Sequence, residues 1–383
     1  MKIAFIYDSA YPWFNGGIER RRMLIAKKFV ENGDEVHYFT MFRKGMPGYE
    51  FKYDKIYFHC VGNATDESKM YVNGRRNITW ALKFAFLLLF KLGKYKFDIV
   101  DADAMPYLHL MPTAIYSKLK KAKFIISWAE VWDEEYWMSY AGGIIGRIGF
   151  FIEKLSSGLS EYHIMNSSKT KTEFTELFDN SNKKIAIFPC AISSEEIVKA
   201  NLSGAASIGI KSSNLFVAIG RLIPEKRFDY AIEEIYRTEA RLEIIGSGPE
   251  SKKLTKLAER LGLGKRIIFK KRLRRTEIIN VIKSSAGMLM MSEREGLSLA
   301  TLEAVALRVP VIITETTNLP REVKRLCIQV KRKELHSVIN RIVKNNSVFA
   351  KEVNSKSEEA IENFSDKNTI MVYRNLTRSR EYK

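Results

Sequence analysis

The residues best suited to chemistry lie in the second half of the chain. Segment 220–226 (GRLIPEK) follows a short apolar run and places Arg221 and Lys226 a few positions apart. A guanidinium grips oxygen atoms bidentately and an ammonium supplies a compact positive charge, so such a pair suits a diphosphate. Taken alone, the two residues could equally be surface charges.

Two further motifs also follow apolar runs. Gly246 opens a glycine-rich turn at 246–250 (GSGPE), which lets a ligand or a neighbouring backbone approach closely. Segment 292–304 (SEREGLSLATLEA) opens a helix whose first amides would point at an anion. Within it, Glu295 and Glu303 are carboxylates that can accept hydrogen bonds from sugar hydroxyls, although a capping acid and a solvated acid are the structural alternatives. All three motifs follow strands of one predicted sheet, which favours a functional site.

Alternating apolar runs and helical stretches predict the elements that must position these motifs. We expect strands at 3–7, 35–40, 97–100, 123–128 and 162–165, and then at 215–219, 242–245, 267–269, 287–291 and 309–313. This alternation is typical of parallel sheets covered by helices on both faces. It predicts an α/β protein with two doubly wound, Rossmann-like domains, whose ligands bind at the carboxyl ends of the strands in the cleft between them.

Length and composition agree with two soluble domains. The chain has 383 residues, of which 46% are hydrophobic, and no apolar stretch reaches the ~18 residues of a spanning helix. The first apolar run turns acidic at Asp8, too early for a signal peptide, so we expect a cytoplasmic protein. The widely spaced Cys60, Cys190 and Cys327 predict reduced thiols rather than a disulfide framework or a zinc site.

The charge balance favours anionic partners. Lys and Arg number 63 against 44 Asp and Glu, a formal charge of +19. The densest basic cluster lies at 265–275 and is either a solvated face or an anion site. A second basic region surrounds the apolar segment 80–90, which Lys83 interrupts and which Arg75, Arg76, Lys91, Lys94 and Lys96 flank. This segment is either a buried helix or a docking element for an anionic membrane surface.

Together the motifs resemble those of retaining GT-B glycosyltransferases, specifically glycosyltransferase family 4 (glycosyl transferases group 1). The resemblance covers segments 220–226 and 246–250, the pair Glu295 and Glu303, and segment 309–312 (VPVI). It extends to 15–19 (NGGIE) near the amino terminus and to 189–192 (PCAI) before the expected linker.

The resemblance implies a role for each motif. Arg221 and Lys226 would neutralise the donor diphosphate, Glu295 would hold hydroxyls of the donor sugar, and Glu303 would hold the ribose. Lys271 and Arg272 would lie near the nucleotide base. The remaining donor-binding positions, several of them acting through backbone amides, would be Gly16, Gly17, Gly220, Gly246, Gly296, Leu297, Ser298 and Leu299.

It also implies domain limits and a reaction without cofactor or metal. We expect an acceptor-binding domain at 1–192, a linker at 193–213, a nucleotide-sugar domain at 214–363, and a helix at 364–383 that crosses back to the first domain. The two cations would take the place of a divalent ion, because no Asp-x-Asp pair follows a strand of the second domain.

Three positions depart from the family pattern. Arg227 and Arg308 stand where relatives usually have glycine, and we expect turns to tolerate them. Ala129 stands where relatives often carry histidine before a glutamate. In the implied front-face reaction the donor phosphate takes the acceptor's proton, so the missing histidine need not abolish transfer.

Other groups would then have to orient the acceptor hydroxyl. The candidates are Glu130, which Trp128 and Trp132 flank, and Asp101 or Asp103, which follow the strand expected at 97–100. The two tryptophans would line a sugar site or belong to the core.

The acceptor is expected to be a glycan or a lipid-linked glycan, with the protein cytoplasmic or peripheral on the cytoplasmic face of the membrane. Three alternatives use the same sequence features. A GT-B nucleotide-sugar epimerase would need no acceptor, and a degenerate sugar-nucleotide binder would not turn over. A basic nucleic-acid-binding protein is disfavoured, because aromatic residues are not interleaved with the basic cluster.

Overall fold

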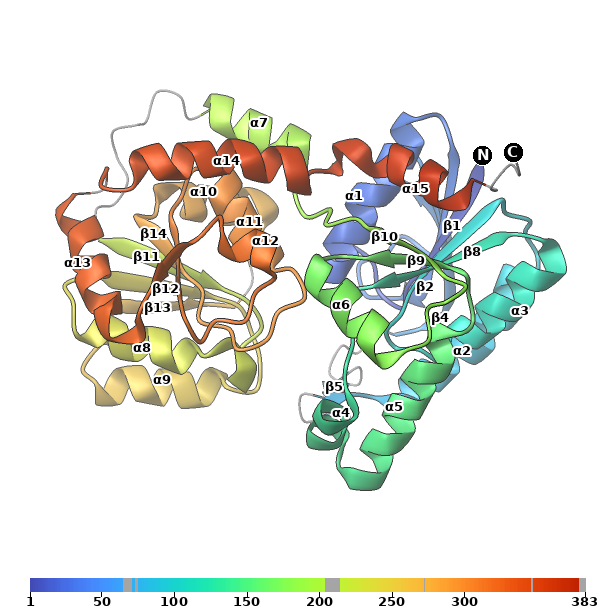
Figure 1. The fold of residues 1–383 in the computed structure, drawn as a ribbon, viewed down its shortest axis with the longest axis horizontal. Coiled ribbons are helices and arrows are strands. Elements are labelled where there is room, and N and C mark those ends of the chain that lie inside the picture. The colour runs from blue at the N-terminus through green and yellow to red at the C-terminus, as the bar shows by residue number, and fades with distance from the viewer. Residues whose placement is uncertain (65–70, 73–74, 204–213, 272, 346, 379–383) are drawn as a thin grey trace. The chain divides into compact units, whose positions relative to one another are not determined.

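The structure is a computed structural model that describes residues 1–64, 71–72, 75–203, 214–271, 273–345 and 347–378. The chain divides into two units, each built around its own sheet (Figure 1). The first unit comprises Met1–Cys190 and Asp366–Lys383, and the second comprises Ala191–Ser365. The chain therefore leaves the first unit after Cys190 and returns to it after Ser365.

The first unit contains an eight-stranded sheet in the order β10-β9-β8-β7-β1-β2-β4-β3. All neighbouring strands are parallel except β3 and β4. The strands are β1 (Lys2–Ile6), β2 (Glu35–Phe42), β3 (Glu50–Tyr53), β4 (Ile56–Asn63), β7 (Ile99–Asp103), β8 (Lys123–Trp128), β9 (Tyr162–Met165) and β10 (Lys184–Ile187). A separate short ribbon pairs β5 (Tyr71–Val72) with β6 (Arg75–Arg76).

The β3–β4 hairpin is an element that the sequence reading missed. Its turn residues, Asp54 and Lys55, both have positive φ angles of 48° and 64°. Hairpin turns of this geometry usually carry Asn-Gly or Asp-Gly, and Lys55 stands here in place of the glycine, so the usual signal is incomplete. The edge strand β10 was also missed, because its run KIAI is only four residues long and only partly buried.

Helices cover both faces of this sheet because successive side chains of each strand point in opposite directions. Ile3 and Phe5 of β1 pack with the helices on one face, whereas Ala4 and Ile6 pack with those on the other. Helices α1 (Gly17–Glu31) and α15 (Thr369–Thr377) cover the first face. The opposite face is covered by α2 (Ile78–Leu92), α3 (Leu110–Lys120) and α6 (Ser168–Leu177). Helices α4 (Glu134–Ala141) and α5 (Gly143–Ser157) pack against each other.

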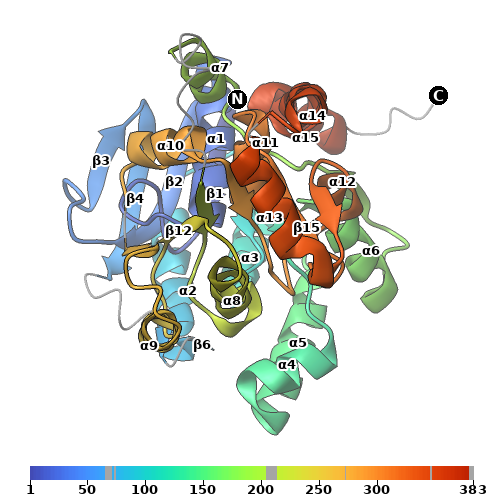
Figure 2. The same cartoon turned by 90° about the vertical axis from the view of Figure 1, so that its left-hand side faces the viewer.

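The second unit contains a parallel six-stranded sheet in the order β13-β12-β11-β14-β15-β16. Its strands are β11 (Leu215–Ile219), β12 (Arg241–Ile245), β13 (Ile267–Lys270), β14 (Gly287–Leu289), β15 (Val311–Thr314) and β16 (Ile328–Val330). Helices α8 (Phe228–Tyr236) and α9 (Ser251–Arg260) lie side by side (Figures 1 and 2) and cover one face together with α13 (Leu335–Lys344). The other face is covered by α7 (Ser194–Ser203), α10 (Arg275–Ser284), α11 (Leu299–Ala306) and α14 (Ala350–Phe364). The short helix α12 (Arg321–Lys324) precedes β16.

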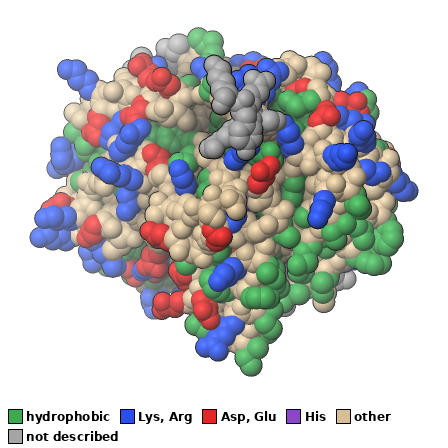
Figure 3. Space-filling model, turned by 45° about the vertical axis from the view of Figure 1, so that its right-hand side comes forward, with side chains coloured by type: hydrophobic (Ala, Val, Ile, Leu, Met, Phe, Trp, Pro, Cys, Tyr) green, Lys and Arg blue, Asp and Glu red, His purple; other side chains and the backbone are tan. Residues whose placement is uncertain are grey.

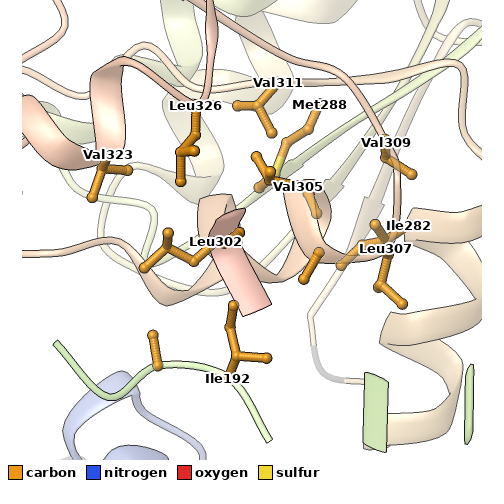
Figure 4. Packing of buried hydrophobic residues seen from close by; sticks show 14 of the residues in the cluster. Ile192, Ile282, Met288, Leu302, Val305, Leu307, Val309, Val311, Val323 and Leu326 are labelled. Atoms are coloured by element: carbon orange, nitrogen blue, oxygen red, sulfur yellow. The ribbon is translucent and has the colours of Figure 1, made fainter. Parts of the chain in front are cut away.

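Figure 4 shows the core beneath these helices, where Leu302 and Val305 of α11 lie among side chains of the sheet and of the neighbouring segments. Ile197 and Ala200 of α7 belong to the same core. The expectation that 193–213 is a linker is therefore wrong for its first half, because α7 buries apolar side chains against the second unit. Residues 204–213 lie outside the described part of the chain.

The fold expectation is confirmed: both units are doubly wound, Rossmann-like α/β structures. Cys60, Cys190 and Cys327 are buried free thiols.

Candidate active site

Two loops at one edge of the second sheet bring Lys226 and Glu295 together. Lys226 ends the short 3₁₀ turn Pro224–Lys226 after β11, and Glu295 lies in the loop after β14. Because β11 and β14 are adjacent parallel strands, their following loops meet at the same edge. The Lys226 ammonium lies 2.5 Å from Glu295 Oε1, and both side chains are mostly buried. Arg221 is exposed in the same loop as Lys226.

Backbone hydrogen bonds join the two loops. The Glu293 amide donates to the carbonyl oxygen of Glu225 at 2.8 Å, and the Ser292 hydroxyl donates to the same oxygen at 3.2 Å. These hydrogen bonds, formed by residues next to Lys226 and close to Glu295, hold the two loops together and so keep the two side chains within reach of each other. An ammonium with three donors can bind a carboxylate and still offer hydrogen bonds to an incoming anion.

Arg227 and Arg308 adopt the backbone conformation that glycine favours. Their φ angles are 50° and 61°, both left-handed. Arg227 also forms ion pairs with Asp229, at 3.1 Å, and with Glu293. Both positions are thus tolerated in turns, and the side chain of Arg227 adds ion pairs that glycine could not make.

Gly246 and Gly248 permit close packing of two loop backbones. A Cβ at Gly246 would lie 1.9 Å from the carbonyl oxygen of Gly220, and one at Gly248 would lie 2.3 Å from that of Leu222. The Leu222 amide donates to the Ser247 carbonyl oxygen at 3.0 Å. In the structure these glycines let one strand-end loop rest on its neighbour, and donor contact with Gly220 or Gly246 remains a prediction.

Glu303 lies in an ionic cluster that the sequence reading did not foresee. It is buried in α11, and Arg275 Nη1 binds its Oε2 at 2.9 Å. The guanidinium also binds Glu196 of α7 through Nε at 2.9 Å. No sequence signal marked Arg275 as the partner of Glu303, because the two residues belong to different helices and meet only in the folded unit.

The predicted donor-binding residues Ser298 and Leu299 lie at the amino terminus of α11. Ser298 precedes the helix with a left-handed φ of 67°, and Leu299 is its first residue. The first amides of a helix lack intrahelical partners and carry a partial positive charge. Gly296 and Leu297 are buried in the preceding loop, and Lys271 is exposed after β13. Arg272 lies outside the described residues.

In the first unit, the glycine pair caps α1. Gly16 is the N-cap residue and Gly17 opens the helix. A Cβ at Gly16 would lie 2.2 Å from Oε2 of Glu19, whose other oxygen accepts a hydrogen bond from the Ser9 hydroxyl at 2.5 Å. A side chain at residue 16 would therefore displace the Glu19 carboxylate.

Asp101 and Asp103 lie inside the first unit rather than after a strand. β7 runs to Asp103, three residues beyond its expected end at 100, and both carboxylates are almost fully buried. Arg22 Nη1 lies 3.1 Å from Asp101 and 3.7 Å from Asp103, and the Tyr373 hydroxyl of α15 donates to Asp101. Burial raises the pKa of Asp103 to about 7, against the opposing effect of Arg22. The expectation that they follow the strand is wrong, because both lie within β7 and contact Arg22 in the interior.

Glu130, just beyond β8, is more exposed than Asp101 and Asp103. Its Oε2 accepts a hydrogen bond from Trp132 Nε1 at 2.9 Å. Trp128 is fully buried in the core, where its Nε1 donates to His163 Nδ1 at 3.0 Å. Of the two flanking tryptophans, Trp128 is therefore a core residue and Trp132 is the one that contacts Glu130.

Comparisons with known proteins agree with this architecture. The family model described as Glycosyltransferase Family 4 matches residues 15–196, and the one described as Glycosyl transferases group 1 matches residues 205–363. An uncharacterized glycosyltransferase of Methanocaldococcus jannaschii is 24% identical over 348 residues, which are 85% of this chain and 83% of that protein. A second uncharacterized glycosyltransferase of that organism is 24% identical over 72% of this chain and 71% of its own length.

Solved structures share the whole fold at low identity. Sucrose-phosphate synthase from Thermosynechococcus elongatus has a TM-score of 0.80 at 14% identity, with 98% of each chain covered. Anabaena HepE in complex with UDP-glucose has a TM-score of 0.69 at 15% identity, again with 98% of each chain covered. WaaG, a glycosyltransferase involved in lipopolysaccharide biosynthesis, has a TM-score of 0.72 at 16% identity, with 98% of this chain and 100% of that chain covered. Because glycosyltransferase models match both halves and the fold spans the whole chain, the protein is a GT-B glycosyltransferase of the group 1 family.

Proposed function

We propose that this enzyme transfers a sugar from a nucleoside-diphosphate sugar to a hydroxyl of a lipid-linked glycan, with retention of configuration. The observation that carries the proposal is the Lys226–Glu295 ion pair at the edge of the second sheet, with the exposed Arg221 in the same loop as Lys226. Two cations suit a diphosphate, and a carboxylate suits the hydroxyls of the attached sugar.

The proposed roles follow from these contacts. Arg221 and Lys226 bind the donor's diphosphate, while Glu295, held by Lys226, contacts the donor sugar. Glu303, oriented by Arg275, contacts the ribose. Solved HepE complexes contain UDP and UDP-glucose, which supports a uridine nucleotide as the first donor to test.

The proposed chemistry balances without an added co-reactant. The bond between the sugar's anomeric carbon and the donor phosphate oxygen breaks, and a bond to the acceptor oxygen forms on the same face. The acceptor's proton passes to the departing phosphate oxygen, whose charge the two cations stabilise. Removal of divalent metal should leave this reaction active, so turnover in EDTA tests it; complete loss that manganese restores would contradict the metal-free proposal.

Glu130 is the proposed acceptor-orienting residue. Its carboxylate is held by Trp132, and it lies beside Ala129, the position of the absent histidine. A carboxylate that hydrogen-bonds the acceptor hydroxyl and orients it, before the proton passes to the phosphate oxygen, contributes roughly a hundredfold, so Glu130→Gln should lower transfer by about that factor. Asp133→Asn, at the exposed N-cap of α4, is the matched control. Unchanged transfer in Glu130→Gln would move the acceptor site elsewhere.

One assay set decides the reaction class. Thermal-shift screening with nucleoside diphosphates and their sugars identifies the donor, because a ligand at 100 times its dissociation constant stabilises by about 2.7 kcal/mol. Product analysis with donor alone and with a glycan acceptor then separates the alternatives. Isomerised donor without acceptor indicates an epimerase, and binding without turnover indicates a sugar-nucleotide binder. Retention requires that the new glycosidic bond have the donor's anomeric configuration by NMR.

The lipid-linked acceptor implies work at a membrane surface, with the protein peripheral on its cytoplasmic face. No helix among the described residues is both long and apolar enough to cross a membrane.

A further inference from the structure

Helix α2 presents apolar side chains on two faces. Its inner face buries Ala81, Phe84, Leu88 and Leu92 in the core. Its outer face leaves Ile78, Leu82, Phe86, Leu89 and Phe90 exposed, and 64% of Phe86 is accessible. A surface helix of a globular protein normally turns polar residues outward. The outer face of α2 therefore needs a partner that accepts apolar groups.

The same pattern recurs on α3, which packs against α2. Met111, Ile115 and Leu119 recur every four residues, so they form one stripe along the helix. All three are exposed, Leu119 by 76%. The two outward stripes thus lie on neighbouring helices.

Helix α5 carries a third stripe. Ile144, Ile148, Phe151 and Leu155 recur at helical spacing and are exposed, as is Ile145; 79% of Ile144 is accessible. Figures 1 and 2 show α4 and α5 side by side as a hairpin that projects from the rest of the first unit. In Figure 3, hydrophobic side chains gather along the lower right of the view. We refer to the exposed apolar side chains of α2, α3 and α5 as the apolar helix face.

The hairpin is held rigidly by two glycines of α5. A Cβ at Gly146 would lie 2.5 Å from backbone atoms of Trp137 and Met138, and one at Gly149 would lie 2.4 Å from the Trp137 ring. The only carboxylate of α5, Glu153, is buried and accepts hydrogen bonds from Trp137 Nε1 and the Trp132 amide. The exposed stripe of α5 is thus supported from within by α4.

The charged side chains that α2, α3 and α5 themselves expose are all basic. Helices α2 and α3 contain no Asp or Glu, and α5 contains only the buried Glu153. Their exposed charged side chains are Lys83, Lys118, Lys120, Arg147 and Lys154. Two exposed carboxylates on other elements pair with these helices: Glu134 of α4 lies 3.4 Å from Arg147 of α5, and Glu50 of β3 binds Lys91 near the end of α2.

We propose that the apolar helix face docks on the surface of a bilayer that contains anionic lipid. Apolar side chains would enter the boundary between headgroups and acyl chains, while the lysines would bind lipid phosphates. Pairing with a second copy through the same face would set these cations against one another, which disfavours a dimer. An anionic bilayer can accommodate the apolar side chains and the lysines at the same time.

Docking would bring the proposed acceptor residue close to the lipid. Glu130 binds Trp132, the Trp132 ring packs on Trp137 with centroids 4.9 Å apart, and Trp137 rests on Gly149 of α5. Three contacts therefore connect the carboxylate to a helix of the docking face. The idea that docking brings Glu130 to its acceptor rests on the proposed lipid-linked acceptor, but membrane docking itself can be measured without donor or acceptor.

The test is flotation of the full-length protein with vesicles of phosphatidylcholine, with and without phosphatidylglycerol. We compare wild type with three double variants: Leu82→Ser/Phe86→Ser, Ile115→Ser/Leu119→Ser and Ile148→Ser/Phe151→Ser. The matched control, Val198→Ser/Leu202→Ser, removes exposed apolar groups from α7 of the second unit, where Leu202 is 72% accessible. A charge variant, Lys83→Gln/Lys118→Gln/Lys154→Gln, tests the basic residues.

Wild type and control should float with anionic vesicles and be released by salt. Each apolar variant should lose about tenfold or more in vesicle affinity, because burying even one large side chain contributes at least that factor. The charge variant should lose the preference for phosphatidylglycerol. Unchanged thermal stability and nucleotide binding show that a variant is folded.

Two results would overturn the proposal: wild type that ignores anionic vesicles at low salt, or folded apolar variants that bind vesicles as well as wild type. Sedimentation equilibrium without lipid tests the competing occupant. A dimer that the apolar variants dissociate, with no vesicle binding by wild type, would assign the face to a second copy. Failure of docking with intact transfer to a soluble acceptor would leave the transferase proposal standing.

Discussion

The two sheets both place charges near the carboxyl ends of central strands, yet the charges serve different ends. In the first unit, Asp101 and Asp103 lie within β7 and face Arg22 in the interior. In the second unit, Lys226 and Glu295 lie in loops beyond β11 and β14, where each keeps some solvent exposure. The first cluster binds α1 and α15 to the sheet, whereas the second is the proposed donor site.

The difference teaches that a strand-end position alone does not make a binding residue. β7 continues through both aspartates, so helices cover them, whereas β11 and β14 end before their charged residues. The length of a strand relative to its covering helices decides whether a charge at its end is structural or accessible. Four predictions test this distinction.

The largest effect is expected for stability in the first unit. Arg22→Met leaves Asp101 and Asp103 buried without their cation, and breaking a buried pair costs roughly 3–5 kcal/mol. Urea unfolding followed by tryptophan fluorescence measures the loss. Lys199→Met, which removes an exposed ion pair with Glu195, is the control and should change stability little. Equal stability of the two variants would show that the interior cluster does not hold the unit together.

Turnover should respond most to Glu295. Glu295→Gln removes the charge that we propose contacts the donor sugar, and loss of one transition-state contact of this kind costs on the order of a hundredfold or more. Glu303→Gln should instead raise the donor's apparent dissociation constant through the ribose and spare turnover. Steady-state kinetics with varied donor separates the two effects, with the exposed Glu259 of α9 changed to Gln as control. Identical profiles for both substitutions would mean that one role is misassigned.

Nucleotide affinity should depend on the two cations. Arg221→Ala or Lys226→Ala should weaken nucleoside-diphosphate binding by roughly 1.5–3 kcal/mol, because hydrogen bonds to charged groups contribute that much. Isothermal titration calorimetry gives the change, and Lys253→Ala on α9 is a control of the same charge in the same unit. If both substitutions leave the affinity intact, the diphosphate binds elsewhere.

The smallest effect concerns pH and the buried His163. Burial lowers the pKa of this imidazole to about 4, from its usual 6.5. Its Nδ1 accepts from Trp128, and its Nε2 lies 2.9 Å from the Ser160 carbonyl oxygen, to which it donates. As the pH falls below 6.5, His163 becomes protonated in the unfolded chain but stays neutral in the folded chain. The free energy of unfolding therefore decreases until about pH 4, where the folded chain also takes up the proton.

Between pH 7 and 5.5 this contribution is roughly 1 kcal/mol. His163→Gln keeps an acceptor for Trp128 but cannot titrate, so its unfolding free energy should vary less over this range than that of wild type. The difference between the two pH profiles isolates His163 from other titrating groups, including Asp103. Parallel profiles would contradict the depressed pKa.

The local pattern of apolar residues was enough to predict most of the sheet strands, because a buried parallel strand is a short apolar run between amphipathic helices. It failed for the β3–β4 hairpin, where Asp54 and Lys55 take a turn that glycine or asparagine usually makes. It also failed for α7, since composition rich in small residues does not reveal that Ile197 and Ala200 are buried. Both errors concern conformations that distant contacts stabilise.

For the site, the sequence by itself determined which residue types stand at which spacing, and so the donor-site candidates Arg221, Lys226, Glu295 and Glu303. Only the tertiary structure decided that Lys226 pairs with Glu295, that Arg275 holds Glu303, and that Asp101 and Asp103 are interior. It also decided that three helices turn apolar stripes outward. The physical reason is that ion pairing and burial depend on elements far apart in the chain, whereas spacing and residue type are local.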